Sequence, residues 1–331
     1  MTTPPLRYLA AADVVACMPP LPEQIRLAER TLIGLATGAE LPAKTDIHPR
    51  PADSFVHAMP AHLRGEAQDG SADLVGMKWI AGFPTNGPLG LPAIHGLVVV
   101  NDPMTGIPSA ILDGGPITAH RTAAVSGVAI GRWSPPVGGR AVRAAIIGAG
   151  VQGYAHVPVL GHLLAGVELA VHDRLPERAA ALAAAASTVP GIGAARAIAE
   201  PRRAVEDADV VITCVSFGPV RQVMDTGWFS PDALVVAVDY ATSVAADVAT
   251  GAALFLTDER GQLFANRAAG RFDGYPDPHA TLGEAILAGT PRPAGGRVLV
   301  THLGVGLADV VFADAILRVA ESRGAGTLLP R

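Results

Sequence analysis

AAIIGAGVQGYAHVPVLGHLLAGVELAVHDR, residues 144–174, is the stretch that decides the fold. An apolar run, Ala144–Ile147, leads directly into the motif Gly-x-Gly-x-x-Gly at 148–153, and an apolar segment of helix length follows. A second apolar run, Val167–His172, ends at Asp173, which follows the last glycine by 20 residues (173 − 153). Strand, glycine-rich turn, helix, strand and acid in this order predict the first βαβ unit of a dinucleotide-binding fold.

Each part of this motif has a physical task. Gly148 makes the tight turn, Gly150 lets the backbone approach a pyrophosphate, and Gly153 lets helix and strand pack closely. The helix N-terminus offers free N–H groups and a positive dipole end to the phosphates. The charge of Asp173 suits ribose hydroxyls and repels a 2′-phosphate, which favours NAD over NADP, although Arg174 beside it softens that preference. A glycine-rich turn in another α/β fold is the alternative interpretation.

The composition is that of an ordinary globular chain of 331 residues, 50% hydrophobic and 17% charged, with a net charge of −5. Because there is no basic run, we expect neither nucleic acid nor a membrane surface as a partner. The N-terminus does not read as a signal peptide, and the two cysteines form no CxxC motif, so the sequence predicts a cytoplasmic protein. The ten histidines form no HxH or HExxH pattern, and we predict no metal site.

Strand and helix patterns alternate between residues 140 and 260. This alternation predicts an α/β fold with a parallel sheet and right-handed crossovers. The expected strands are Ala141–Ile147, Val167–His172, Asp209–Val215, Leu234–Val238 and Ala253–Thr257, with a helix at Pro176–Ser187.

The flanking parts mix short strands and helices. We expect helices at Glu23–Thr37, Thr118–Trp133 and Ala308–Ser322, strands at Ser54–Met59, Asp73–Ile80 and Gly96–Asn101, and a linker at Ser134–Gly139. Residues 261–331 read as a Gly/Pro-rich stretch before the last of these helices.

Two acids directly follow predicted strands of the parallel sheet. Asp239 comes after Leu234–Val238 and Asp258 after Ala253–Thr257. Ligands of open α/β sheets bind outside the carboxyl ends of the strands, so either acid is a candidate functional residue. A helix N-cap or turn residue is the alternative.

Several further motifs together resemble the ornithine cyclodeaminase/mu-crystallin family. They are Gly76-Met-Lys-Trp-Ile80, Asn101-Asp-Pro103, His120-Arg-Thr-Ala-Ala-Val-Ser126, the glycine-rich segment and Gly304-Val-Gly-Leu-Ala-Asp309. The resemblance extends from about Leu41 to the end of the chain.

The resemblance implies a homodimer and two domains. Residues 1–133 and 300–331 would form a smaller α+β substrate and dimerisation domain completed by the C-terminal helix, and residues 134–299 a Rossmann NAD(P)-binding domain. It also implies hydride transfer between a nicotinamide and the α-carbon of an amino acid or imino acid. The substrate is then a small molecule.

The resemblance also implies roles for individual residues. Lys78 and Arg121 match the cations that bind the substrate carboxylate, as a point charge and a two-pronged donor can. Lys44 is a weaker third candidate. Asp239 matches the acid that exchanges a proton with the reacting nitrogen. Because Arg121 is expected at a helix start, where the dipole disfavours a cation, an anion such as that carboxylate would offset its position.

The expected cofactor contacts lie in the glycine-rich turn and at the ends of other elements. They are Gly148, Gly150, Val151, Gln152, Gly153, Asp173, Arg174, Thr122, Ser216 and His302. His302 falls near the nicotinamide end in the family, and an ordinary core or surface histidine is the alternative.

Departures from the family pattern bear on the activity. His57 stands where ornithine cyclodeaminases carry a glutamate, so it is a substrate-binding candidate that pairs poorly with an ammonium group. Asp239-Tyr-Ala-Thr-Ser243 does not reproduce Asp-x-Pro-Gly-Lys. In its motifs the chain resembles the siderophore-pathway dehydrogenase that acts on N-(2-amino-2-carboxyethyl)glutamate more closely than it resembles ornithine cyclodeaminase. We therefore expect an NAD(P)-dependent amino-acid or imine oxidoreductase. The alternatives are a cyclodeaminase that releases ammonia and recycles NAD, and a non-catalytic binding protein.

Overall fold

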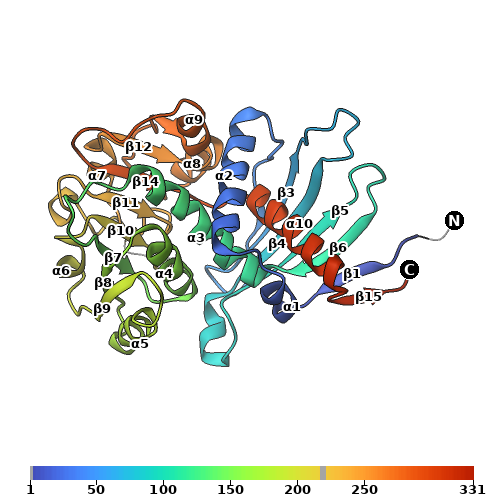
Figure 1. Ribbon diagram of the computed structural model, residues 1–331, viewed down its shortest axis with the longest axis horizontal. Coiled ribbons are helices and arrows are strands. Elements are labelled where there is room, and N and C mark those ends of the chain that lie inside the picture. The colour runs from blue at the N-terminus through green and yellow to red at the C-terminus, as the bar shows by residue number, and fades with distance from the viewer. Residues whose placement is uncertain (1–2, 217–220) are drawn as a thin grey trace. The chain divides into compact units, whose positions relative to one another are not determined.

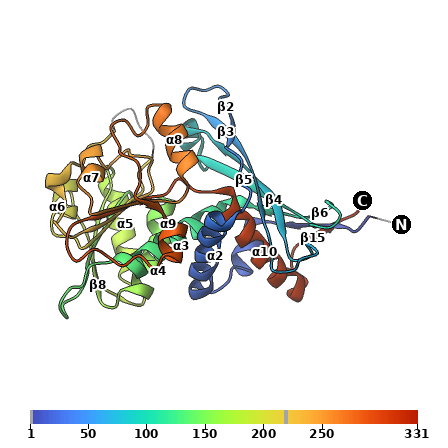
Figure 2. The ribbon, with the colours of Figure 1, turned by 90° about the horizontal axis from the view of Figure 1, so that it is seen from above.

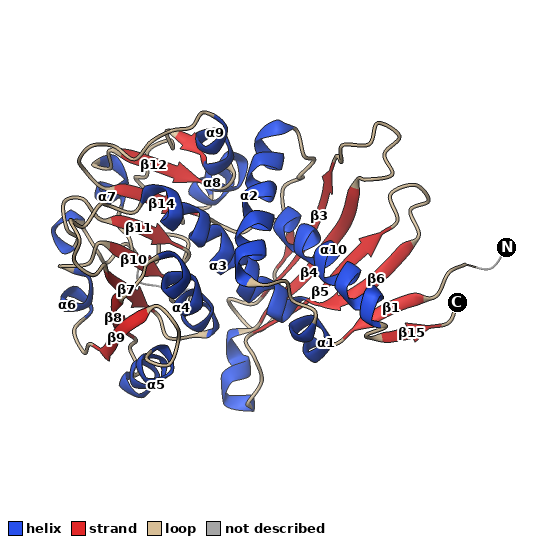
Figure 3. Ribbon diagram, viewed as in Figure 1, coloured by secondary structure: helices blue, strands red, loops and turns tan. Residues whose placement is uncertain are grey.

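A computed structural model describes residues 3–216 and 221–331, and the chain divides into two compact units. Unit 1 comprises Met1–Arg121 and Gly304–Arg331, and unit 2 comprises Thr122–Leu303. Each unit has its own sheet, as the strands in Figure 3 show. The division falls within a helix, before the linker at which the sequence places the boundary.

The sheet of unit 2 has eight strands in the order β13-β12-β14-β11-β10-β7-β8-β9, all of them parallel (Figure 1). The order reverses between β7 and β10, as in doubly wound nucleotide-binding folds. The strands are β7 (Arg143–Ile147), β8 (Val167–His172), β9 (Ile192–Ala197), β10 (Val210–Thr213), β11 (Leu234–Ala237), β12 (Leu254–Thr257), β13 (Ala280–Thr281) and β14 (Val298–Thr301). The helices are α4 (Val151–Leu163), α5 (Pro176–Ala186), α6 (Pro201–Val205), α7 (Ala246–Thr250), α8 (Arg260–Ala268) and α9 (Leu282–Leu287).

The predicted parallel α/β fold is confirmed, and so are the five strands expected in this region. The central strands β10, β11, β12 and β14 are buried along their whole length, as expected where helices cover both faces of a sheet. The sequence interpretation missed β14, because the short run Val298–Thr301, close after Gly295-Gly296, was taken as part of a Gly/Pro-rich stretch.

The sheet of unit 1 has seven strands in the order β15-β1-β6-β5-β4-β3-β2, antiparallel except for the β1–β6 pair. The strands are β1 (Leu6–Leu9), β2 (Thr45–Ile47), β3 (Phe55–Leu63), β4 (Leu74–Gly82), β5 (Ile94–Asn101), β6 (Pro108–Asp113) and β15 (Thr327–Leu329). The helices are α1 (Ala11–Ala16), α2 (Leu21–Thr37) and α10 (Gly306–Arg323), with a 3₁₀ turn at Pro84–Leu89.

Helix α10 packs along β3, β4 and β5, and α2 packs on α10, so both helices cover one face of this sheet (Figure 2). Gly76 in β4 permits the close approach of α10, because a Cβ there would lie 3.1 Å from Val310. Strand β4 alternates accordingly. Lys78 is buried on the covered side, whereas its neighbour Trp79 is 44% exposed.

Helix α3 (Gly114–Trp133) begins four residues earlier than the sequence predicts. The run Gly114-Gly-Pro116 reads as a helix breaker, but proline is tolerated in a first helical turn. Asp113 precedes it and accepts a hydrogen bond from the N–H of Gly115 at 2.8 Å. The prediction that Arg121 lies at a helix start is therefore wrong, since it lies in the third turn of α3. Among the described residues, no helix is long and apolar enough to cross a membrane.

Candidate active site

The glycine-rich turn of unit 2 joins β7 to α4 at the carboxyl edge of the sheet. Gly148 has φ +108°, and a Cβ there would lie 2.7 Å from the backbone oxygen of Cys214. A Cβ on Gly153 would lie 2.4 Å from the oxygen of Gly148. These two glycines are therefore required by the turn and by helix–strand packing. A Cβ on Gly150 would meet no atom within 4 Å, so its side faces space that a phosphate group can occupy.

Asp173 lies just after β8 and binds the glycine-rich turn from outside. One carboxylate oxygen accepts from the N–H of Ala149 at 2.8 Å, and the other accepts from the N–H of Leu175 at 2.9 Å. The side chain is half-buried, so it keeps a solvent-facing part, while Arg174 is exposed. The acid thus orders the turn as well as being a candidate ribose acceptor.

Two alanine substitutions separate these glycine roles. We expect Gly150→Ala to fold normally, with an unfolding free energy within about 0.5 kcal/mol of the parent, yet to weaken NADH binding about tenfold. Gly153→Ala should instead cost about 1–3 kcal/mol of stability, because its methyl group would overlap a backbone oxygen. Urea unfolding and titration of NADH fluorescence measure both. Unchanged NADH affinity in the folded Gly150→Ala variant would contradict a phosphate site here.

Unit 1 contains a cluster of charged side chains that is almost fully buried. Nζ of Lys78, in β4, donates to Oδ1 of Asp309 in α10 at 2.8 Å and to Oγ1 of Thr118 in α3 at 2.6 Å. Nε of Arg121, one helical turn after Thr118, lies 3.4 Å from the same Oδ1. The side chains of Lys78 and Asp309 are 0% exposed and that of Arg121 is 8% exposed.

The charges in this cluster do not balance. Among the residues that the structure describes, two cations share one carboxylate here, which leaves one net positive charge in a buried place. Burial lowers the pKa of Lys78 from 10.5 to about 8, against the raising effect of Asp309, while Arg121 and Lys44 lower it further. A buried charge without a counter-charge is costly, and strongly shifted buried groups concentrate at functional sites. The cluster is therefore suited to an added carboxylate.

The guanidinium group of Arg121 lies against the backbone of Gly304. A Cβ on Gly304, which has φ +78°, would lie 2.5 Å from Nη1 of Arg121, so glycine is required beside the guanidinium group. Within the described part of the chain, Nε of Arg121 and Oδ2 of Asp309 are buried and have no hydrogen-bond partner. These are polar atoms that a bound ligand can satisfy.

The other substrate-binding candidates lie in the same unit. Lys44 directly precedes β2 and is half-buried, and its positive charge lowers the pKa of Lys78. His57 lies in β3 opposite Ile80, two residues along from the Met59–Lys78 pair, and therefore on the same face as Lys78. Its ring stacks on Phe55 at 4.5 Å.

Asp239 lies two residues beyond β11 at the carboxyl edge of the sheet in unit 2, and it is 1% exposed. The Ser243 hydroxyl donates to Oδ2 at 2.6 Å. Burial raises the pKa of Asp239 above its usual 3.8, and the Ser243 bond opposes this. The next two residues, Tyr240 and Ala241, have φ of +53° and +57°, which strains a non-glycine backbone. Such strain is typical of functional sites.

The remaining predicted residues of unit 2 lie within a helix or just after strands of the parallel sheet. His302 directly follows β14 and is 2% exposed, Thr122 is buried in α3, and Ser216 is exposed after β10. Asp258 accepts from the N–H groups of Leu303 and Glu259, both at 2.9 Å, so it orders the segment after β14, which favours the turn interpretation.

Sequence reasoning gave no role to Asp309 or Thr118, the two partners of Lys78. The only signal for Asp309 was its place in the Gly304–Asp309 motif, and a charged residue among apolar positions of a helix is a clue to a buried partner.

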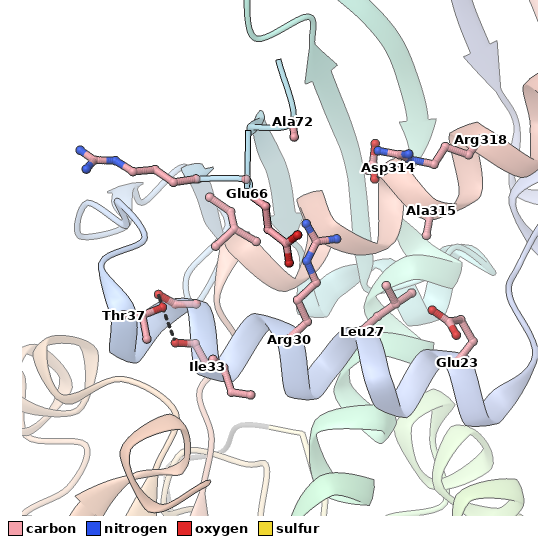
Figure 4. A pocket seen from close by; sticks show the side chains of 14 residues that line it. Glu23, Leu27, Arg30, Ile33, Thr37, Glu66, Ala72, Asp314, Ala315 and Arg318 are labelled. Carbon is pink, nitrogen blue, oxygen red and sulfur yellow. Dashed lines mark hydrogen bonds and ion pairs between the residues drawn. The ribbon is translucent and has the colours of Figure 1, made fainter. Parts of the chain in front are cut away.

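A separate hollow of about 570 Å³ lies in unit 1 between α2, α10 and the β3–β4 connection (Figure 4). Side chains of both charges line it, including Arg30, Glu66, Asp314 and Arg318. It contains none of the predicted site residues, and we assign it no role. No cluster of metal-binding side chains occurs among residues 3–216 and 221–331.

The doubly wound sheet and its glycine-rich turn define a dinucleotide-binding α/β protein. The chain belongs to the ornithine cyclodeaminase/mu-crystallin family, whose model matches residues 10–250. Nodulation efficiency protein NfeD of Rhizobium meliloti is 33% identical over 98% of both chains. Mouse ketimine reductase mu-crystallin is 28% identical over 84% of this chain and 85% of the relative.

The same fold is found among solved structures. That of Thermococcus litoralis Delta(1)-pyrroline-2-carboxylate reductase, in complex with NADH and L-proline, matches with a TM-score of 0.83 at 24% identity. The match covers 97% of this chain and 99% of that one. This likeness confirms the predicted fold class.

Proposed function

We propose that the chain is an NAD(P)-dependent oxidoreductase that interconverts a small amino acid and its imine, with NAD as the preferred cofactor. The observation that carries this proposal is the buried Lys78–Arg121–Asp309 cluster with one net positive charge, which suits a substrate carboxylate. The names of two similar proteins, a ketimine reductase and a pyrroline-2-carboxylate reductase in complex with NADH, support it.

In this proposal, different residues of the chain bind the substrate and transfer its proton. When bound, the nicotinamide accepts or returns a hydride at the substrate α-carbon. Lys78 and Arg121 bind the carboxylate through charge-assisted hydrogen bonds and thereby orient the α-carbon. Asp239 takes a proton from the substrate ammonium, so that the nitrogen lone pair forms the C=N bond as the hydride leaves. In reduction, Asp239 returns that proton to the nitrogen.

The pKa of Lys78 predicts how carboxylate binding depends on pH. The protonated lysine binds the carboxylate, so affinity is complete below the pKa of about 8 and is lost as the pH rises through it. We expect the inhibition constant of a non-aminated 2-oxo acid to rise up to about tenfold per pH unit above that point. Lys78→Arg is the matched control, since arginine stays charged and should flatten the profile. A flat profile in the parent enzyme would contradict the assignment.

The proposed reaction is tested by following NADH absorbance in both directions, with ammonia assayed in parallel. The panel is L-alanine, L-ornithine, L-lysine, aspartate, an N-carboxyalkyl amino acid, and 2-oxo acids with ammonia or amines. Substrate-dependent NADH formation or consumption supports an oxidoreductase. Ammonia release from ornithine or lysine with a constant NADH signal would instead identify a cyclodeaminase. Cofactor binding without any turnover would favour a binding protein.

We also propose that the chain acts as a homodimer through the uncovered face of the unit 1 sheet. Trp79 and Leu97 are paired across β4 and β5, lie on the same face, and are 44% and 39% exposed. Apolar side chains grouped on one sheet face favour association with a second copy. Sedimentation velocity tests this, and a monomer at micromolar concentration would contradict it.

A further inference from the structure

Three buried polar side chains of unit 2 are joined in a row by hydrogen bonds. Nδ1 of His156 lies 2.7 Å from the backbone oxygen of Gln152, and its Nε2 lies 2.8 Å from Oγ of Ser126. The same Oγ lies 2.9 Å from Nε2 of His302. His156 and Ser126 are 0% exposed and His302 is 2% exposed. The mechanism above uses none of these contacts.

The direction of every bond in this row follows from its first member. A carbonyl oxygen only accepts, so Nδ1 of His156 carries a hydrogen. Burial lowers the pKa of His156 to about 4, so the ring is neutral and its Nε2 accepts from the hydroxyl of Ser126. Ser126, having donated its hydrogen, accepts from His302. Nε2 of His302 is therefore a donor, and in this tautomer its Nδ1 is an acceptor.

The row links two parts of the cofactor-binding edge of unit 2. Gln152 lies in the first turn of α4, two residues after Gly150. His302 follows β14, and its N–H donates to the oxygen of Ala237, two residues before Asp239. Both ends thus lie where the strands of a doubly wound sheet meet their ligand.

We propose that Ser126 and His156 are positioning residues that fix the proton of His302 on Nε2, so that Nδ1 accepts a hydrogen bond from an N–H donor of the bound reactants. The inference rests on the proposed function for the identity of those reactants. Two sources have this chemistry: the carboxamide of the nicotinamide ring, and the amine or imine nitrogen of the substrate.

Two variants of His302 distinguish the roles of its two ring nitrogens. The amide nitrogen of Gln reaches the place of Nε2, so His302→Gln keeps the bond to Ser126 and loses the acceptor. The amide of Asn reaches the place of Nδ1, so His302→Asn keeps an acceptor there. Dissociation constants are measured for NADH and for ADP-ribose, which lacks the nicotinamide, together with kcat/KM. His162→Gln, on the exposed face of α4, is the matched control.

If the carboxamide is the donor, His302→Gln raises the dissociation constant of NADH about tenfold and leaves that of ADP-ribose unchanged. If the substrate nitrogen is the donor, both dissociation constants stay constant and kcat/KM falls about tenfold. In either case His302→Asn has the smaller effect, and Ser126→Ala changes the same quantity in the same direction. Equal weakening of NADH and ADP-ribose, or no effect of His302→Gln on any of the three quantities, would overturn the inference.

The tautomers are also directly observable in the intact protein by ¹⁵N spectra of the imidazole rings, assigned with His156→Asn and His302→Gln. We expect hydrogen on Nδ1 of His156 and on Nε2 of His302 near neutral pH. The opposite tautomer of His302 would overturn the proposal. Because this measurement needs no turnover, it decides the inference even if the substrate panel shows no reaction and the proposed function fails.

Discussion

Replacing Asp239 by asparagine is expected to lower kcat by about 10²–10⁴-fold, because the asparagine amide cannot take or return the proton of the reacting nitrogen. The substitution keeps the size of the side chain, and its oxygen can still accept from Ser243. Burial raises the pKa of the carboxyl, which makes it a better proton acceptor than an exposed aspartate. Initial rates of NADH formation, with circular dichroism to verify folding, measure the effect.

The matched control is Asp209→Asn. Asp209 directly precedes β10, at the amino end of a neighbouring strand, and pairs with Arg140 at 2.6 Å near the surface. Its loss should lower stability slightly and leave turnover nearly unchanged. If Asp239→Asn and Asp209→Asn had similar rates, Asp239 would have no part in proton transfer.

Asp309→Asn is expected to destabilise the protein by about 3–5 kcal/mol, as the removal of one partner from a buried ion pair does. The variant leaves Lys78 and Arg121 buried beside each other without a carboxylate. Urea unfolding measures the loss. A substrate-like carboxylate should restore part of it, since a ligand that binds only the folded state stabilises that state.

A second variant keeps this prediction decisive if Asp309→Asn unfolds too readily to be measured. Lys78→Met combined with Asp309→Asn removes one buried cation along with the carboxylate. We expect the double variant to be more stable than Asp309→Asn alone, which a double-mutant cycle expresses as a coupling energy. Equal unfolding midpoints for the parent and Asp309→Asn would contradict the role given to this pair.

The sequence predicted the parallel sheet and the glycine-rich turn because their signals are local. Gly148 and Gly153 are dictated by contacts within one βαβ unit, so their spacing carries the information. Short strands such as β14 were missed, since a four-residue strand close to glycines carries no distinctive period.

The candidate site was predicted in part. The family resemblance selected Lys78 and Arg121, but it did not reveal their partner. Asp309 is 231 residues from Lys78 in the chain, and no periodicity or spacing rule connects positions so far apart. Likewise, Asp113 caps the first turn of α3, and this contact was not recognised in the sequence. The helix start was therefore predicted too late, and Arg121 was wrongly expected at that start.

Unit 1 is built from both ends of the chain, and this has a consequence for synthesis on the ribosome. Unit 2 is a continuous segment, so all of its residues emerge before Gly304. The N-terminal part of unit 1 emerges first, yet it must wait for α10 to supply Asp309 and to cover the inner face of its sheet. Until then, burying Lys78 is costly and the apolar strands stay open to solvent. We therefore expect the first segment to leave the ribosome to reach its native state last, and a chain that stops short of α10 lacks the Asp309 partner of Lys78.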